Sequence, residues 1–364
     1  MSELADHLCR RIALEGPLTV AEYMRECLVN PRHGYYMSGD PFGRGGDFIT
    51  APEISQMFGE LIGLWCAVAW QQMGSPTPFR LVELGPGRGT LMADALRTAA
   101  GVAGFREAAD LHLVELSPAL RGAQGEALNG DAPNWHDDLN GVPEGPMILI
   151  ANEFFDALPI HQFERTADGW NERRIGVDDD GDFVFVAAPG PMWDAAPVDA
   201  RPGEIVEVCP AAAGVVRAIG ERLVSYGGAA LIIDYGYAAR ETGDTLQAVR
   251  QHAFHDILSR PGEADLTAHV DFAALAEAAA GQGVAVHGPV GQGEFLESLG
   301  ISARAEALLK AARPEQAEAI RSGHHRLVAT EAMGRLFKAL AIADPDLGPL
   351  PGFSNPSDGP ILAP

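Results

Sequence analysis

The sequence has few cysteines and few basic side chains. Its 364 residues include four cysteines, which lie far apart and form no CxxC pair. This spacing excludes a disulfide framework and a structural zinc site, and it fits a reducing, cytoplasmic compartment. Lysine and arginine number 26 against 50 acidic residues, so the formal net charge is −24. Since a nucleic-acid-binding face needs basic side chains, we expect no nucleic-acid partner, whereas an acidic cleft can attract a cationic one.

Long apolar runs are also missing. No stretch approaches the roughly 20 residues that a membrane-spanning helix needs, so we expect no membrane span. Residues 1–16 alternate charged and apolar side chains, lack the apolar core of a secretory signal and contain acids, which transit peptides avoid. With 47% apolar and 21% charged residues, the composition is that of an ordinary globular protein with one large α/β domain or two small ones.

The order of apolar segments predicts an α/β fold. Short apolar runs at 80–84, 111–115, 147–151 and 229–234 alternate with helical patterns, and a last strand is expected near 336–342. Such runs predict a parallel sheet covered by helices on both faces. We assign residues 1–75 to an N-terminal helical cap with a lid loop, 76–160 and 205–342 to the core, 161–204 to an inserted β-hairpin with a loop, and 343–364 to an extended tail.

A glycine-rich loop follows the first of these strands. Gly85, Pro86, Gly87, Gly89 and Thr90 lie between a predicted strand and a predicted helix. Glycines allow a sharp turn and a close approach of the backbone to a ligand, and the helix start offers N–H groups to a carboxylate or phosphate. The G-x-G-x-G spacing differs from the G-x-G-x-x-G of dinucleotide sites, which makes a nicotinamide dehydrogenase the weakest alternative.

Acidic residues at the ends of neighbouring strands indicate the ligand class. Glu83 lies two residues before the first glycine, where enzymes that use S-adenosylmethionine (SAM) place a carboxylate near the methionyl part. Glu115 ends the next strand, where its acceptor oxygens suit both hydroxyls of a ribose. Asp137, which we prefer to Asp138, follows a third strand and can accept from an adenine amino group. Acids in this order predict a SAM site.

A second group of polar residues follows the strand at 147–151. We assign Asn152 to the cofactor and expect Glu153 and Asp156 to face the methyl donor, because ligands of open α/β sheets bind outside the carboxyl ends of the strands. Two carboxylates can hold a guanidinium, localise its charge and accept its proton, so these two residues are the catalytic candidates. The alternatives are a helix cap for Asp156 and a structural role for Glu153.

Aromatic residues before the sheet are candidates for a lid or a substrate contact. Tyr35, Tyr36, Asp47 and Phe48 belong to a glycine-rich loop, and loops that carry aromatic side chains often exclude water from a site. Ordinary packing of the cap on the sheet explains Phe48 equally well.

Two further residues are candidates for orienting a substrate. Asp265 and His269 are spaced i, i+4, although His269 can equally be a core histidine. His252 and His255 lack a further ligand at matching spacing, so we expect them on a helix and expect no metal site.

Several segments together resemble one family. These segments are 34–36, 46–50, 52–56, 83–90, 152–159, 233–236, 243–248 and 265–272. In them the sequence resembles the MidA family, the mitochondrial complex I assembly arginine methyltransferases and their bacterial relatives, within the class I SAM-dependent methyltransferases. The resemblance covers almost the whole chain and departs at Ala51, where serine is usual.

This resemblance implies a Rossmann-like class I methyltransferase fold with one antiparallel strand, and SAM as the cofactor. It further implies dimethylation of a protein arginine, with the quinone-proximal subunit of respiratory complex I as the expected substrate and the bacterial cytoplasm as the compartment. Two alternatives stay open: a small-molecule methyltransferase, and a SAM-binding complex I assembly factor without turnover. The insertion and the cap favour a protein-sized acceptor, and the intact glycine loop and acids favour turnover.

Overall fold

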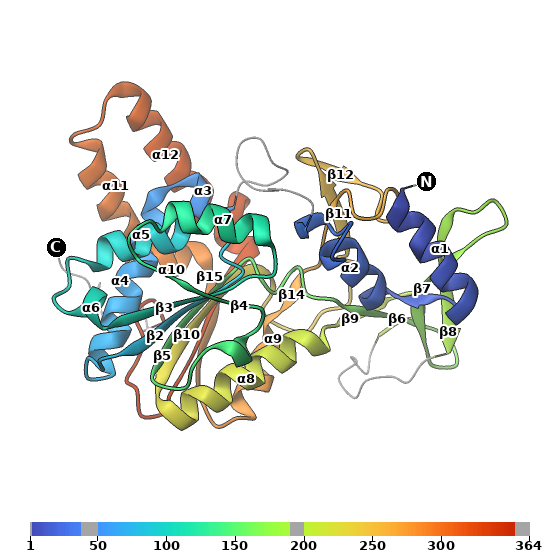
Figure 1. Ribbon diagram of the computed structural model, residues 1–364, viewed down its shortest axis with the longest axis horizontal. Helices are drawn as coiled ribbons and strands as arrows, with labels where there is room; N and C mark the ends of the chain where they lie inside the picture. Colours follow the sequence, from blue (N-terminus) through green and yellow to red (C-terminus); the bar gives the residue numbers. More distant parts are fainter. Residues whose placement is uncertain (1, 38–49, 190–199, 354–364) are drawn as a thin grey trace. The chain divides into compact units, whose positions relative to one another are not determined.

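The computed structural model describes residues 2–37, 50–189 and 200–353, and it divides into two compact units (Figure 1). Unit 1 takes its described residues from Met1–Phe48, Phe155–Gly214 and Ala239–Asp271. Unit 2 takes them from Ile49–Phe154, Val215–Ala238 and Phe272–Pro364. Each unit therefore combines segments that are far apart in the sequence. The domain boundaries expected from the sequence remain a prediction.

Unit 2 contains the central sheet of the protein. Its strand order is β15 (Ala285–Gly291), β16 (Phe337–Ala343), β10 (Gly228–Tyr237), β5 (Met147–Asn152), β2 (Phe79–Leu84), β3 (Ala109–Val114), β4 (Asn134–His136). The strands from β10 to β4 pair in parallel, whereas β16 runs antiparallel to both of its neighbours. This arrangement confirms the predicted α/β fold with a parallel sheet and one antiparallel strand.

Helices cover both faces of this sheet, because its strands are apolar on both sides. One core cluster contains Ile148 and Ile150 of β5 together with residues of α4 (Gln56–Gln72) and α5 (Thr90–Ala99). The alternate residue Leu149 is also fully buried and faces the other way. Helix α9 (Phe272–Ala280) packs against β10, β15 and β16, and Figure 1 shows it with α8 (Pro210–Tyr226) on the face opposite α4.

The remaining elements of unit 2 are short or lie outside the sheet. They are α3 (Ala51–Ile54), α6 (Phe105–Ala108), α7 (Pro118–Ala127), η2 (Leu139–Gly141), α10 (Gln292–Ser298), α11 (Ile301–Leu309), α12 (Pro314–Val328) and η3 (Thr330–Gly334). Helices α11 and α12 pack against each other as an antiparallel pair (Figure 1).

Unit 1 contains two smaller antiparallel sheets. In the first, the order is β1 (Leu18–Thr19), β7 (Trp170–Val177), β6 (His161–Arg165), β9 (Ile205–Val208), and β8 (Phe183–Pro189) pairs with β7. The predicted hairpin is present as β7 and β8, and Gly181 in its turn has a φ of +87°. The second sheet has the order β12 (Ala253–His255), β11 (Gln247–Arg250), β13 (Asp265–Thr267). Strand β14 (Val270–Asp271) comes after β13 in the sequence and is not part of this sheet. The helix expected around His252 and His255 is wrong, because these residues form a hairpin turn and strand β12.

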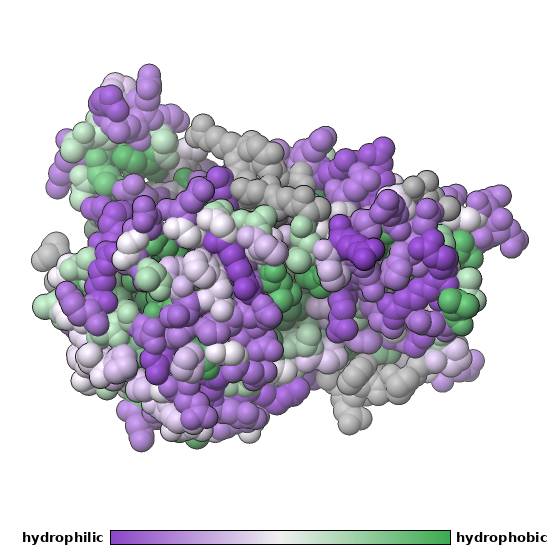
Figure 2. All heavy atoms as spheres, viewed as in Figure 1, coloured by the Kyte–Doolittle hydropathy of each residue, from purple (hydrophilic) through white to green (hydrophobic). Residues whose placement is uncertain are grey.

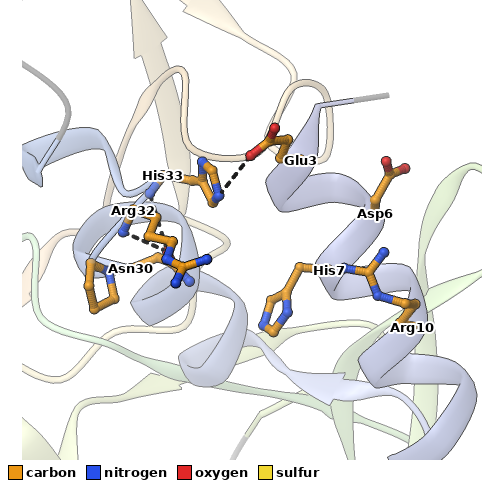
Figure 3. A pocket seen from close by; sticks show the side chains of 8 residues that line it. Glu3, Asp6, His7, Arg10, Asn30, Arg32 and His33 are labelled. Atoms are coloured by element: carbon orange, nitrogen blue, oxygen red, sulfur yellow. Dashed lines mark hydrogen bonds and ion pairs between the residues drawn. The ribbon is translucent and has the colours of Figure 1, made fainter.

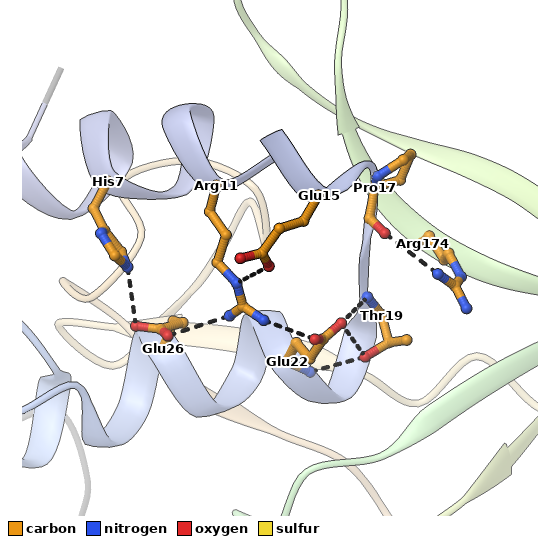
Figure 4. Close-up of polar contacts among 8 residues, drawn as sticks. All are labelled: His7, Arg11, Glu15, Pro17, Thr19, Glu22, Glu26 and Arg174. Carbon is orange, nitrogen blue, oxygen red and sulfur yellow. Dashed lines mark hydrogen bonds and ion pairs between the residues drawn. The ribbon is translucent and has the colours of Figure 1, made fainter. Parts of the chain in front are cut away.

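Two helices of unit 1, α1 (Glu3–Glu15) and α2 (Val20–Val29), are joined by a network of ion pairs (Figure 4). Helix α2 begins with a capping box, in which Thr19 Oγ1 accepts the Glu22 N–H and Glu22 Oε2 accepts the Thr19 N–H. Arg11 of α1 contacts Glu15 at 2.8 Å, Glu22 at 2.7 Å and Glu26 at 3.3 Å. One guanidinium thus links the two helices.

The visible surface is largely hydrophilic, as Figure 2 shows, which accords with the net charge of −24. Among the helices of the described residues, none is both long enough and apolar enough to cross a membrane.

Candidate functional site

The predicted glycine loop joins β2 to α5 in unit 2. Gly85, Gly87 and Gly89 have φ values of +60°, +52° and +83°, a region that L-residues with a side chain rarely adopt. The loop is held by hydrogen bonds from the Gly85 N–H to Val114 O at 3.0 Å and from the Gly89 N–H to Pro86 O at 2.8 Å. Helix α5 starts directly after Gly89, so its first N–H groups are directed toward this loop.

Two buried oxygen atoms near this loop have no hydrogen-bond partner among the described residues: Oε2 of Glu83 and Oδ1 of Asn152. Glu83 pairs with Ile150 in the register of β2 and β5, so its side chain and that of Asn152 lie on the same face of the sheet. Burial raises the pKa of Glu83 to about 8. Two unsatisfied acceptors beside a loop without Cβ atoms fit a ligand that carries an ammonium group and other N–H or O–H donors, as SAM does.

Glu115 lies directly after β3 and is fixed from two sides. Its Oε1 accepts the Ser117 N–H at 2.8 Å, and its Oε2 accepts the Gln124 amide at 3.1 Å. Burial raises the pKa of this carboxyl, although these hydrogen bonds act in the opposite direction. Each oxygen keeps a second lone pair, which suits a ribose diol.

Gln124 of α7 is a site residue that the sequence reasoning missed. Its amide nitrogen also donates to Gly87 O at 2.8 Å, and its oxygen accepts the Trp135 indole N–H at 2.8 Å. Gln124 therefore ties Glu115 to the glycine loop. No local motif marks a glutamine inside a helix, so only the fold reveals this role.

The two acids after β4 have different surroundings. The Asp138 carboxylate caps η2 by accepting the N–H groups of Asn140 and Gly141 at 2.9 and 3.2 Å. The Asp137 side chain is 82% exposed and pairs with Arg121 at 2.6 Å. Asp138 thus serves a local turn, and the assignment of Asp137 to the adenine amino group stays a prediction.

Glu153 follows β5 in a left-handed conformation with a φ of +51°. Strained backbone of this kind is concentrated at functional sites. Its Oε1 accepts the Ala51 N–H at 3.0 Å and the Asn152 amide at 3.1 Å, and its own N–H donates to Ile233 O at 2.9 Å. The carboxylate therefore holds the start of α3.

Helix α3 is attached to the glycine loop as well. The Thr90 hydroxyl donates to Glu53 Oε1 at 2.5 Å. The contact of Thr90 with the cofactor, expected from its place in the glycine loop, stays a prediction. Glu53 is a second residue that the sequence reasoning left without a role, although it lies in one of the segments that carry the family resemblance.

Several of the acceptor-side candidates, though not Glu153, lie in unit 1. Tyr36 of η1 (Tyr35–Met37) donates its hydroxyl hydrogen to Asp265 Oδ1 at 2.8 Å, and its ring packs edge-to-face on Tyr35 with a centroid distance of 5.3 Å. The pKa of Tyr36 is raised well above its ordinary value, first by burial and then by the charges of Asp265 and Asp156. Both acids are buried, at 5% and 7% exposure. Unit 1 thus brings two of the predicted carboxylates and one tyrosine together.

The other predicted residues are distributed as follows. The boundary between the units falls between Phe154 and Phe155, so Glu153 belongs to unit 2 and Asp156 to unit 1. The backbone N–H of His269 donates to Thr245 Oγ1 at 2.8 Å. Asp47 and Phe48 lie outside the described residues.

A pocket of about 470 Å³ lies elsewhere in unit 1, between the first turns of α1 and the residues after α2 (Figure 3). Its lining mixes both signs of charge, and Glu3 pairs with His33 across it at 3.3 Å. None of the predicted site residues lines this pocket.

Comparisons with known proteins identify the family. Residues 61–290 match the family described as "Putative S-adenosyl-L-methionine-dependent methyltransferase". The chain is 40% identical to the mitochondrial protein arginine methyltransferase NDUFAF7 of Xenopus tropicalis, over 97% of this chain and 89% of that one. It is 42% identical to the NDUFAF7 homologue of Drosophila melanogaster, over 96% and 88% of the two chains.

A solved structure is similar over the same extent. It is the crystal structure of a protein from Burkholderia thailandensis bound to S-adenosyl-homocysteine (SAH), with a TM-score of 0.86, 32% identity and coverage of 97% of this chain and 94% of that one. The family match covers more than half of the chain, and its description names the cofactor class that the glycine loop and the unsatisfied acceptors fit. The chain therefore belongs to this family of SAM-dependent methyltransferases.

Proposed function

We propose that this protein transfers a methyl group from SAM to an arginine side chain of a protein. The observation that carries the proposal is the hydrogen bond from the Tyr36 hydroxyl to the buried Asp265 in unit 1, together with a second buried acid, Asp156, whose charge acts on the same tyrosine. Two carboxylates and a hydroxyl match the planar fork of a guanidinium, which has five N–H donors. The names of the relatives, which are protein arginine methyltransferases, support the same substrate class.

The cofactor half of the site is assigned to unit 2. When bound, SAM supplies a methyl group that its sulfonium charge already activates. Glu83 and Asn152 accept hydrogen bonds from the methionyl ammonium, the first N–H groups of α5 hold the carboxylate, and Glu115 holds the ribose hydroxyls. Asp137 accepts from the adenine amino group. These residues bind and align the cofactor, and alignment supplies most of the rate for a displacement of this kind.

The acceptor half is assigned to Glu153, Asp156 and Asp265. A protonated guanidinium is a weak nucleophile, so carboxylates that localise its charge on the far nitrogens make the reacting nitrogen more nucleophilic. Glu153 and Asp156 would hold the guanidinium. One of them would accept its proton as the C–N bond forms and the S–CH3 bond of SAM breaks, with SAH as the leaving group. Asp265 and Tyr36 orient the substrate.

The degree of methylation, the acceptor protein, the role of His269 and the cellular compartment belong to the same proposal. Dimethylation, and the quinone-proximal subunit of complex I as the acceptor, rest on the family resemblance. A role of His269 in orienting the substrate rests on its spacing from Asp265. The proposal of a cytoplasmic compartment rests on the four cysteines, which are all free. The relatives from Xenopus tropicalis and Drosophila melanogaster carry "mitochondrial" in their names.

The test is transfer of a labelled methyl group from SAM into an extract of cells that lack this protein, followed by mass spectrometry of the labelled protein. We expect label on an arginine. Label on a metabolite with no labelled protein would favour the small-molecule methyltransferase, and tight SAH binding without any transfer would favour the assembly factor.

The variant Glu153→Gln sharpens this test. Its amide oxygen can still accept from Ala51 and Asn152, so these two hydrogen bonds are kept while the charge is lost. We expect turnover to fall by about 100-fold or more, with little change in SAH affinity. Glu107→Gln, at an exposed acid of α6, is the matched control. A parallel loss of SAH affinity in Glu153→Gln would contradict the division of roles between the two halves.

A further inference from the structure

Glu207 of β9 is a buried carboxylate of unit 1 to which the proposed mechanism gives no role. It is 7% exposed. Its Oε1 accepts the N–H groups of Thr245 and Leu246 at 3.0 and 3.1 Å and the amide of Gln162 at 2.7 Å, and its Oε2 accepts the Thr245 hydroxyl. Burial raises the pKa of Glu207, and these donors act against that effect. The carboxylate thus fixes the segment around Thr245 along the edge of β9.

The Thr245 hydroxyl continues this network toward the acceptor-side acids. While it donates to Glu207, its oxygen accepts the His269 N–H at 2.8 Å. The neighbouring Ala268 N–H donates to the backbone oxygen of Asp156 at 3.0 Å. Glu207 therefore holds Thr245, Thr245 holds the backbone at His269, and the adjacent Ala268 N–H holds the backbone that carries Asp156.

The contact between Glu207 and Thr245 also sets the position of Asp265. Strand β11 begins at Gln247, two residues after Thr245, and pairs with β13. In that register Val249 lies opposite Asp265, and the Gln247 amide donates to Thr267 Oγ1 at 3.3 Å. Fixing Thr245 therefore fixes the start of β11 and, through the strand pairing, the position of Asp265.

We infer that Glu207 and Thr245 are positioning residues for the acceptor half of the site. They do not touch the substrate, but they hold the backbone that carries Asp156 and Asp265 in the geometry that a guanidinium requires. This inference rests on the proposed function, because it needs an acceptor that these two acids bind. A misplacement of about 1 Å in such a site lowers the rate by up to about 100-fold.

The test compares Thr245→Val, which removes the hydroxyl at nearly constant volume, with Thr245→Ser, which restores it. The matched control is Thr166→Val in the β6–β7 turn of the same unit, where the hydroxyl donates only to Gly169 O at 3.1 Å. For each variant, the initial rate of labelling is measured at saturating SAM and at several concentrations of an extract from cells that lack the protein. The quantity compared is the slope of this rate against the extract concentration. The extract is separated into protein and small-molecule fractions, and SAH affinity is measured by calorimetry.

We expect Thr245→Val to lower the slope of rate against extract concentration by about 10- to 100-fold, with Thr245→Ser within about threefold of the wild type. SAH affinity and the slope for Thr166→Val should stay within about twofold of the wild type. A wild-type slope for Thr245→Val, or equal losses of slope and SAH affinity, overturns the inference. If Thr245→Val does not fold, Glu207→Gln is measured in the same way, because an amide NH₂ cannot accept from the Thr245 hydroxyl.

The wild-type result separates this inference from the proposed function. Label confined to small molecules refutes the proposed function, and the slope measured on that fraction still decides whether Thr245 positions the acceptor acids. An absence of transfer into either fraction, despite SAH binding, overturns both.

Discussion

Glu83 offers a quantitative test of the cofactor half of the site. Burial raises its pKa to about 8, so the cofactor-free protein keeps a proton on this carboxyl at neutral pH. An ammonium group placed beside it favours the ionised form, so binding of SAM or SAH requires loss of the proton. Each pH unit below 8 therefore weakens binding by about tenfold, and the Kd for SAH at pH 6 should exceed that at pH 8.5 by between about 50- and 100-fold.

The assay is titration calorimetry with SAH from pH 6 to 8.5, in two buffers that differ in heat of ionisation. The wild type should release close to one proton per SAH bound at pH 7. Glu83→Gln should bind more weakly at pH 8.5 and show little pH dependence. A wild-type Kd independent of pH, or a Glu83→Gln variant that keeps the full dependence, would refute the assignment of this proton to Glu83.

The same carboxyl affects stability in a direction opposite to that of most acids. Its pKa is raised on folding, so between the unfolded value near 4.5 and about 8 the unfolded chain is ionised while the folded chain is neutral. Stability is therefore lost as pH rises through this range. Relative to Glu83→Gln, the wild type without cofactor should lose about 3 kcal/mol of unfolding free energy between pH 5 and 8, measured by urea unfolding.

Three further changes test the surrounding structure. Gly85→Ala should destabilise the protein by about 1–2 kcal/mol in urea unfolding and weaken SAH binding, because φ is +60° and the new Cβ would lie 3.0 Å from Phe154; unchanged stability would contradict the left-handed conformation. Burial raises the pKa of Glu60, but hydrogen bonds and charge from Arg304 and Arg97 outweigh this effect and lower it, so the stability that Glu60 supplies is lost as pH falls below about 4.5. Glu60→Gln should therefore cost about 1–3 kcal/mol at pH 7 and less at pH 4, and a pH-independent difference would exclude the ionic role. Arg11→Met should cost about 1 kcal/mol, reduced by 0.5 M salt in the same assay, and no salt dependence would indicate that only packing is lost.

The sheet and the glycine loop could be predicted because their signals are local. Apolar runs of five or six residues mark the parallel strands, and glycines mark positions that need a positive φ. The family resemblance supplied the antiparallel strand near the end of the core. Acids such as Glu83 could be named in advance because they follow or end these strands, where ligands of α/β sheets bind.

The supporting contacts could not be predicted, because they join residues that are distant in sequence. Gln124 meets Gly87 across 37 positions, and Glu207 meets Thr245 across 38. Neither contact leaves a periodic pattern in the sequence. The hydrogen bond from the Thr90 hydroxyl to Glu53 likewise spans 37 positions, and the contact of Thr90 with the cofactor stays a prediction.

Strand β16 has a consequence for synthesis of the chain on the ribosome. It pairs on one side with β10 and on the other with β15, and both of those strands are translated earlier. Until residues 337–343 emerge, a nascent chain exposes the unpaired edge of β10, whose buried residues are almost all apolar. The central sheet therefore closes after translation of its other strands, and a transcript cut short before codon 337 should yield an aggregating product that engages molecular chaperones.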